Sequence, residues 1–193
     1  MTGIKKWSTV NKTISEHKIA ILALQETHLD QALLHDINTC FGKRLMVLNF
    51  QDLNNPCATV GVTFVVNKAL ISPKELSMSK LIKGCAQSLK IKWHENEEAI
   101  LINVYAWNNR NEHRDFWGQL EAKRRSQNIR HPDFLMGDFN ITEDPIDRAP
   151  AHPDNLNTIE ALWNLRHSLD LQDSWRHTYP HDQNFTYHAN NNG

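Results

Sequence analysis

Three polar clusters whose side chains could do chemistry each stand at the end of an apolar run. They are Gln25-Glu26-Thr27, Asn103-Val104-Tyr105 and Gly137-Asp138-Phe139-Asn140. Ligands of α/β sheets gather outside the carboxyl ends of strands, so the clusters are expected to meet in one cleft. Carboxylate and amide oxygens are hard ligands that suit Mg²⁺ or Mn²⁺. A cation, a second carboxylate and a phenol together fit hydrolysis of a phosphate ester, because the metal stabilises charge on the phosphoryl oxygens and a carboxylate takes a proton from water.

Each of these residues also has a purely structural interpretation. A glutamate such as Glu26, directly after a buried strand, often marks the start of a helix. Asp138 and Asn140 stand in a sequence that commonly forms a turn. Tyr105 at a strand end is commonly part of the core, with its hydroxyl at the edge. The combination of the three clusters is what favours a functional site.

Hydrophobic periodicity predicts the elements that must position these clusters. Spacings of three and four predict helices, and short apolar or alternating runs bounded by turn residues predict strands. Helices are expected at about residues 4–18, 30–39, 112–127 and 156–167, and strands at about 19–24, 45–50, 60–66, 89–93, 99–105, 134–136 and 185–187. Asp30 can cap the second helix, and the strand at 134–136 is expected to be buried. Strands with one wet face, strands with none and helices between them indicate a layered α/β protein whose sheets are covered by helices.

Length and composition fit one globular domain over residues 1–193. The net charge of −1 argues against a strong non-specific binder of polyanions, which would be basic overall. No apolar stretch is long enough to span a membrane and no secretory signal is present, so an intracellular protein, nuclear or cytoplasmic and not secreted, is expected. The three widely spaced cysteines fit neither a disulfide framework nor a zinc site.

Charge is spread unevenly along the chain. Lys123, Arg124, Arg125 and Arg130 form a basic run, and the stretch 143–173 carries seven acidic residues against two arginines. The simpler interpretation is two solvated faces, and the alternative is a basic rim beside an acidic pocket that holds a cation. The basic run is expected to be a solvated helix end rather than the main contact for DNA.

In order and spacing, the three clusters and the segments around them resemble the endonuclease/exonuclease/phosphatase superfamily. The similarity is closest to the endonuclease domains of non-LTR (LINE-type) retrotransposons and their fungal relatives. It rests on residues 21–29, 61–68, 102–106 and 135–140, on the loop 145–150, and on residues 173–176 and 185–187. The resemblance implies an α/β fold, a four-layer sandwich of two face-to-face mixed β-sheets flanked by helices. It also implies that the family's first strand and its C-terminal strands are missing from this chain.

The resemblance further implies a phosphodiesterase, dependent on Mg²⁺ (or Mn²⁺), that nicks DNA by metal-assisted attack of water. Glu26 is similar to the family's metal-binding glutamate, and Tyr105 to the tyrosine that touches the scissile phosphate. Asp138 is similar to the aspartate that orients or deprotonates the attacking water, and Asn140 to the asparagine that holds a phosphate oxygen. DNA is thus the expected partner, with no membrane and no obligate protein partner implied.

Two more residues are implied to bind substrate, and other parts of the family pattern have no counterpart. Arg148 lies in the loop after the Asp138 motif, and Thr186 occupies the place of a hydroxyl residue that contacts nucleic acid. An asparagine after the first strand, a late S-x-I-D aspartate and a terminal Asp–His pair are absent. Two alternatives therefore stay open. One is a catalytically inactive remnant that serves at most as a weak DNA-binding or structural module, and the other is a phosphatase acting on another phosphate ester.

Overall fold

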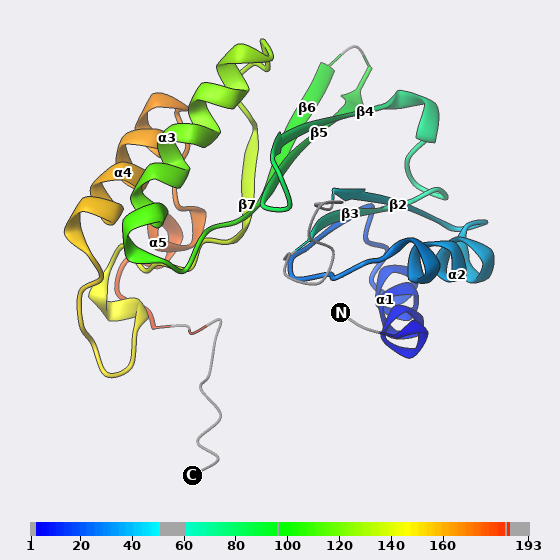
Figure 1. The fold of residues 1–193 in the computed structure, drawn as a ribbon, viewed down its shortest axis with the longest axis horizontal. Coiled ribbons are helices and arrows are strands. Elements are labelled where there is room, and N and C mark those ends of the chain that lie inside the picture. The colour runs from blue at the N-terminus through cyan, green and yellow to red at the C-terminus, as the bar shows by residue number, and fades with distance from the viewer. Residues whose placement is uncertain (1–2, 51–60, 96, 184, 186–193) are drawn as a thin grey trace.

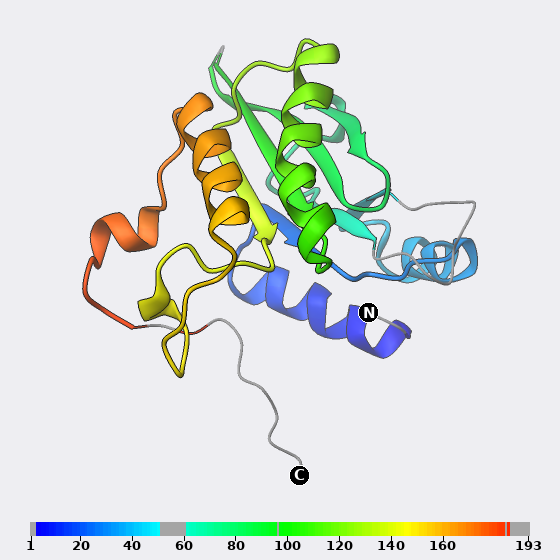
Figure 2. The ribbon, with the colours of Figure 1, turned by 60° about the vertical axis from the view of Figure 1, so that its left-hand side comes forward.

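Two β-sheets lie face to face at the centre of the molecule, and each is covered on its outer side by helices (Figure 1). The computed structural model describes residues 3–50, 61–95, 97–183 and 185. A second view shows α3 and α4 side by side in front of the second sheet, with α1 running below the strands (Figure 2). This arrangement confirms the predicted α/β fold with two sheets flanked by helices.

The first sheet consists of three antiparallel strands. They are β1 (Ile21–Leu24), β2 (Leu45–Phe50) and β3 (Val62–Asn67), in the order β1-β3-β2. The central strand β3 is buried along its whole length, including the polar residues Thr63 and Asn67 that interrupt its apolar run. Leu24 at the end of β1 pairs with Thr63, so the cluster that follows β1 emerges at the edge of the sheet near the start of β3.

The second sheet is mixed and contains one parallel pair. Its strands are β4 (Leu76–Ile82), β5 (Ala86–His94), β6 (Glu97–Tyr105) and β7 (Phe134–Asp138), in that order. The strands β4, β5 and β6 are antiparallel neighbours, whereas β6 and β7 are parallel and are connected through α3 (Arg110–Ser126). A parallel pair places the ends of both strands at the same edge, so Tyr105 lies opposite Asp138.

Two pairs of helices form the outer layers. The helices α1 (Ile4–Glu16) and α2 (Gln31–Phe41) pack on the first sheet, whereas α3 and α4 (Leu156–Ser168) pack on the second (Figure 1). Asp30 caps α2 as predicted, because its carboxylate accepts a hydrogen bond of 2.7 Å from the Leu33 backbone N–H. No helix in the described part of the chain is long and apolar enough to cross a membrane.

Apolar side chains from both sheets fill the space between them. Phe64 of β3 and Leu89 of β5 are fully buried there, and Leu101 of β6 is nearly so. Each such side chain contributes about 1.5–3 kcal/mol by leaving water. This layer therefore fixes how the two sheets sit relative to each other, and with it any site to which both sheets contribute.

The structure corrects several of the sequence-based expectations. The strand β4 escapes prediction because Ser77, Ser79 and Lys80 interrupt its apolar pattern. The strand predicted to be buried at 134–136 is β7, and Phe134 in it is 49% exposed. The predicted last strand begins at Phe185, which belongs to no strand, and its other two residues lie outside the described part of the chain. A short helix, α5 (Ser174–Thr178), was not expected from the pattern.

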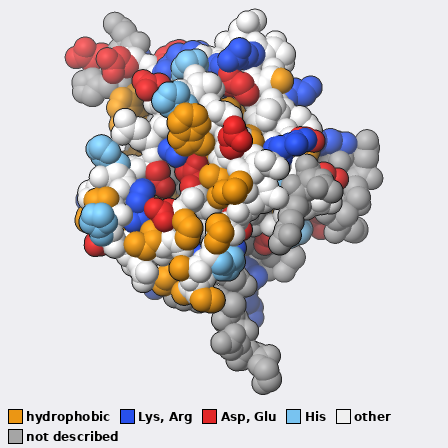
Figure 3. Space-filling model, turned by 90° about the vertical axis from the view of Figure 1, so that its left-hand side faces the viewer, with side chains coloured by type: hydrophobic (Ala, Val, Ile, Leu, Met, Phe, Trp, Pro, Cys, Tyr) orange, Lys and Arg blue, Asp and Glu red, His pale blue; other side chains and the backbone are white. Residues whose placement is uncertain are grey.

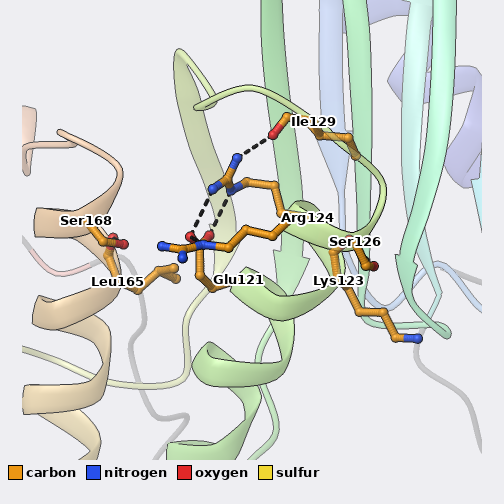
Figure 4. A network of polar contacts seen from close by, with 8 residues as sticks. Glu121, Lys123, Arg124, Ser126, Ile129, Leu165 and Ser168 are labelled. Atoms are coloured by element: carbon orange, nitrogen blue, oxygen red, sulfur yellow. Dashed lines mark hydrogen bonds and ion pairs between the residues drawn. The ribbon is translucent and has the colours of Figure 1, made fainter.

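The basic run at the end of α3 is partly buried rather than fully solvated. Arg124 is 6% exposed, and its guanidinium binds Glu121 at 2.7 Å and 2.9 Å and donates to the Ile129 carbonyl (Figure 4). These arginine hydrogen bonds hold the pKa of Glu121 below its usual range. Arg125 binds the same carboxylate at 2.6 Å, and Arg130 pairs with Asp133 at 2.9 Å. Arg124 is therefore fixed in the end of the helix, whereas Lys123, Arg125 and Arg130 are exposed.

Candidate active site

Four of the predicted site residues lie at one edge of the sandwich. Tyr105 and Asp138 are the last residues of β6 and β7 and stand opposite each other in the parallel register. Glu26 comes from the other sheet, two residues after β1, and its Oε1 accepts a hydrogen bond of 2.7 Å from the Tyr105 hydroxyl. Asn140 lies two residues after Asp138, in the turn that follows β7. The Tyr105 hydroxyl is therefore the point at which the contributions of the two sheets meet.

A tight turn after β7 carries Asp138 and Asn140. The Asp138 side-chain Oδ1 accepts a hydrogen bond of 3.0 Å from the Asn140 backbone N–H. The Asp138 carbonyl accepts one of 2.8 Å from the Ala106 backbone N–H. The Asn140 side-chain Nδ2 donates to the Ala106 carbonyl at 2.7 Å. Because Ala106 directly follows Tyr105, these bonds fix the turn relative to the phenol.

The backbone at this edge adopts conformations that most residues avoid. Glu26, His28 and Asn140 have φ values of 52°, 45° and 51°, in the left-handed region. Such residues persist only where their surroundings hold them, at a cost of about 1–3 kcal/mol each, and they gather at functional sites. Gly137 has a φ of 135°, and a Cβ there would lie 1.9 Å from the Val104 carbonyl oxygen, so only glycine fits.

Gln25 and Asn103, which belong to the polar clusters but were given no role from the sequence, form a buried amide network beside these residues. Asn103 of β6 is 0% exposed, and its Oδ1 accepts a hydrogen bond of 2.6 Å from Gln25 Nε2. Its Nδ2 donates to the carbonyls of Leu24 and Thr63, both at 3.1 Å. All three partners belong to the first sheet or to the residue after β1, so Asn103 joins the two sheets next to Glu26. The available signal was that Gln25 and Asn103 are polar residues at the ends of apolar runs.

The surroundings of Tyr105 raise its pKa to about 12. Burial is the largest cause, followed by the hydrogen bond to the Glu26 carboxylate and by the negative charge of Glu26. The charge of Asp138 adds to the rise, and the Asn140 side chain opposes it. At neutral pH the phenol is therefore a stable hydrogen-bond donor rather than a base.

We expect Tyr105 to ionise at about pH 12 in the folded protein. Because its pKa is raised above the value of roughly 10 for an unfolded tyrosine, the stabilisation is fully present below pH 10 and is lost as the pH rises towards 12. The ultraviolet absorbance of tyrosinate, recorded as wild type minus Tyr105→Phe, measures this step. The exposed Tyr179→Phe variant is the control and should leave the step in place. A Tyr105 midpoint near 10 would contradict the expectation.

The two residues predicted to bind substrate are less closely tied to these four. Arg148 is held within its own loop, where Nη2 binds Asp154 at 2.7 Å and Nη1 lies 3.0 Å from the His152 ring. The same Asp154 carboxylate accepts two hydrogen bonds from Thr142. Thr186 lies outside the residues that the structure describes. A substrate role for Arg148 and Thr186 thus stays a prediction.

Three of the seven acidic residues in the stretch 143–173 form ion pairs with arginines. Glu143 binds Arg166 at 2.7 Å, Asp147 binds Arg176, and Asp154 binds Arg148. Figure 3 shows acidic and basic side chains close together on this face, with hydrophobic side chains around them. The burial of Glu143 raises its pKa, and Arg166 acts against that rise. These ion pairs favour the structural interpretation of the stretch over an acidic pocket for a cation.

The oxygens at the sheet edge fit a hard cation held by few protein ligands. No group of three or more His, Cys, Asp or Glu side chains suited to a metal occurs among the described residues. Zinc in a structural site would need such a group. Mg²⁺ keeps several waters and is bound through one or two carboxylates, and the exposed carboxylates of Glu26 and Asp138 stand at this edge. The oxygen side chains present at this edge are therefore of the kind that suits a hard cation.

A groove of about 450 Å³ lies at the opposite end of the sheets. It is lined by Ala20, which precedes β1, and by Ile91 and Trp93 near the end of β5. Glu26 and Tyr105 follow or close the other ends of β1 and β6. The groove is therefore separate from the edge that carries the predicted site residues.

Comparisons with known proteins agree with this fold. A model of the Endonuclease/Exonuclease/phosphatase family matches residues 8–193. The AP endonuclease from Leishmania major is similar in structure, with a TM-score of 0.65 and 17% identity over 94% of this chain and 66% of that one. A functionally unknown conserved protein from Enterococcus faecalis V583 has a TM-score of 0.50 and 17% identity over 71% of this chain and 60% of that one. No curated protein matches the sequence significantly.

The comparisons differ in how much they show. The chain spans about two thirds of the length of the Leishmania major AP endonuclease, and at 17% identity that likeness shows the fold. The family model extends over nearly the whole chain, from residue 8 to the last residue. The chain therefore belongs to the endonuclease/exonuclease/phosphatase family.

Proposed function

We propose that the chain is a Mg²⁺-dependent phosphodiesterase that nicks DNA, of the kind found in non-LTR retrotransposons. The observation that supports this most is the meeting of Glu26, Tyr105 and the Asp138–Asn140 turn at one sheet edge. A phenol, an amide and two carboxylates in that arrangement suit attack of water on a phosphodiester. The match to retrotransposon motifs favours DNA among the substrates of the family.

Asp138 is the residue to which we assign the proton transfer. Its carboxylate is exposed at the end of β7, and the Asn140 backbone N–H occupies one of its oxygens at 3.0 Å. The carboxylate takes a proton from the attacking water as the new P–O bond forms. The bond from phosphorus to the leaving oxygen breaks, and that oxygen takes a proton from solvent. Proton transfer to a positioned base of this kind contributes about 10²–10⁴-fold to the rate.

Tyr105, Asn140 and Glu26 hold the phosphate in place for this attack. The Tyr105 phenol stays protonated at neutral pH, because its pKa is about 12. Its single O–H donates to Glu26 Oε1 in this structure, so it can donate to a phosphate oxygen only by turning away from Glu26. The Asn140 amide is fixed by its bond to the Ala106 carbonyl and supplies a polar group beside the phenol. Glu26 would hold Mg²⁺, which when bound neutralises charge that develops on the phosphoryl oxygens.

The nicking of a supercoiled plasmid tests the proposal. We expect conversion to the relaxed form with Mg²⁺ and none after chelation with EDTA. Few phosphate contacts are expected from a chain of net charge −1, so binding should be modest. Binding should weaken as salt rises, because phosphate contacts release counterions, but only with the shallow slope that few contacts give. Absence of Mg²⁺-dependent nicking across a range of protein and metal concentrations would contradict the proposal.

Replacing Glu26 by glutamine is expected to raise the Mg²⁺ concentration needed for half-maximal nicking by about 10-fold or more. The amide keeps the size of the side chain and can still accept the Tyr105 hydrogen bond, but it lacks the charge that attracts the cation. A Mg²⁺ titration of the nicking rate measures the shift. Glu16→Gln, at the exposed end of α1, is the matched control and should leave the titration unchanged. An unchanged midpoint for Glu26→Gln would remove Glu26 as the metal ligand.

A second candidate function is hydrolysis of another phosphate ester on the same edge. The net charge of −1 is compatible with a small substrate, which needs no extended basic surface. A substrate panel of DNA, inositol polyphosphates and sphingomyelin separates the two candidates. Turnover of a small ester without nicking of DNA would favour the second. No turnover of any member of the panel would favour an inactive module.

A further inference from the structure

His113 is a buried polar residue that the proposed chemistry does not use. It lies in the first turns of α3 and is 6% exposed. Its Nε2 is 2.9 Å from the carbonyl oxygen of Phe139, the residue between Asp138 and Asn140. A carbonyl oxygen can only accept, so Nε2 carries the hydrogen and donates it. Burial lowers the pKa of His113, and the Phe139 carbonyl and the charges of Asp154 and Asp138 act against that fall.

The bond from His113 acts on a peptide group that also touches the Asp138 carboxylate. The carbonyl of Phe139 and the N–H of Asn140 belong to one planar peptide group. His113 holds the carbonyl end of that plane at 2.9 Å, and Asp138 Oδ1 holds the N–H end at 3.0 Å. A rotation of the plane that breaks the first bond also displaces the second. His113 is therefore linked to the orientation of Asp138 through one rigid unit.

The turn needs this support because its backbone is not in a relaxed conformation. Asn140 has a φ of 51°, which a residue keeps only where its surroundings hold it. The Ala106 contacts hold the turn from the side of β6. On the side of α3 the contacts come from His113 and from Trp117, whose ring stacks on Phe139 with centroids 5.5 Å apart. The stacked rings fix the Phe139 side chain, and the His113 bond fixes its peptide plane.

We propose that His113 is a positioning residue that orients the Asp138 carboxylate by holding the Phe139–Asn140 peptide. The proposal rests on the proposed function for its effect on rate, and on the geometry alone for its effect on the turn. A glutamine at position 113 can place an N–H near the position of Nε2, whereas a leucine fills the space without a donor. Comparing the two variants therefore separates the effect of the hydrogen bond from the effect of side-chain packing.

The kinetic test compares His113→Leu and His113→Gln on a DNA duplex with Mg²⁺. For the leucine variant we expect kcat to fall on the order of 10-fold to 100-fold, because small displacements of a catalytic group have effects of that size. KM should stay unchanged, since the buried His113 side chain is only 6% exposed. The glutamine variant should recover most of kcat. His35→Leu, on the exposed surface of α2, is the matched control and should behave as wild type.

A second measurement does not depend on activity. Amide hydrogen exchange of Asn140, read by NMR, reports the bond between its N–H and Asp138 Oδ1. In the leucine variant this exchange should accelerate on the order of 10-fold by local opening, while the amide of Leu101 in β6 keeps its wild-type rate. In the glutamine variant both rates should stay near wild type. A general loss of stability would instead accelerate both amides.

Each possible result either supports or overturns the positioning role of His113. Faster exchange at Asn140 alone, rescued by glutamine, supports the positioning role even if wild-type protein nicks no DNA, and in that case the proposed function is what fails. Wild-type exchange at Asn140 in the leucine variant overturns the positioning role, whatever the activity. If the leucine variant does not fold, the glutamine variant decides. Loss of kcat and of Asn140 protection in a folded glutamine variant overturns the proposal.

Discussion

Replacement of Asp138 by asparagine is expected to lower the nicking rate by about 10²–10⁴-fold, the range that a general base contributes. The asparagine side chain keeps an oxygen that can accept from the Asn140 N–H, so the turn should survive. It cannot take a proton from water, and it carries no charge to attract a cation. The loss should therefore appear in kcat rather than in the folding of the chain.

Nicking rates under single-turnover conditions measure this loss, with circular dichroism as the check on folding. Asp36→Asn is the matched control, because Asp36 is exposed on α2 and belongs to none of the contacts at the sheet edge that carries Asp138. It should leave the rate unchanged. A rate for Asp138→Asn within a few-fold of wild type would mean that another group takes the proton.

Replacement of Asn103 by leucine is expected to destabilise the protein by about 2–5 kcal/mol, because several buried polar groups lose a partner at once. Gln25 Nε2 loses its acceptor, and the carbonyls of Leu24 and Thr63 lose a donor. Leucine has a similar volume, so little of the effect comes from an empty space. Glu26 follows Gln25 directly, so the nicking rate should fall as well.

Urea denaturation followed by tryptophan fluorescence measures the free energy of unfolding. Asn38→Ala, at an exposed position of α2, is the control and should change the stability by no more than about 0.5 kcal/mol. A change below about 1 kcal/mol for Asn103→Leu would show that water or a neighbouring group replaces the lost hydrogen bonds.

Local sequence signals predicted most of the elements, because those elements follow local rules. Asp30 caps α2, and the alternating run around Leu89 forms β5. β4 was missed because the polar residues Ser77 and Ser79 interrupt its apolar sequence. This strand depends on pairing with β5. β7 was wrongly expected to be buried, since an apolar run says nothing of which neighbours cover it. Long-range pairing decides both cases.

The sequence could predict which side chains lie at the edge of the candidate site, but not the hydrogen bonds that hold them there. A parallel β6–β7 pair explains why Tyr105 and Asp138 lie opposite each other. The bonds made by Asn103 and His113 join residues 78, 79, 40 and 26 positions away along the chain. No local pattern encodes contacts of that range.

The close approach of Gly137 to Val104 limits how this edge could be reshaped by protein engineering. A side chain at position 137 would collide with the backbone of the neighbouring strand, so a library that randomises this position would return almost exclusively the parental residue. Diversity aimed at new substrates belongs instead in the exposed loop between η2 (Pro145–Asp147) and α4, where added atoms meet solvent.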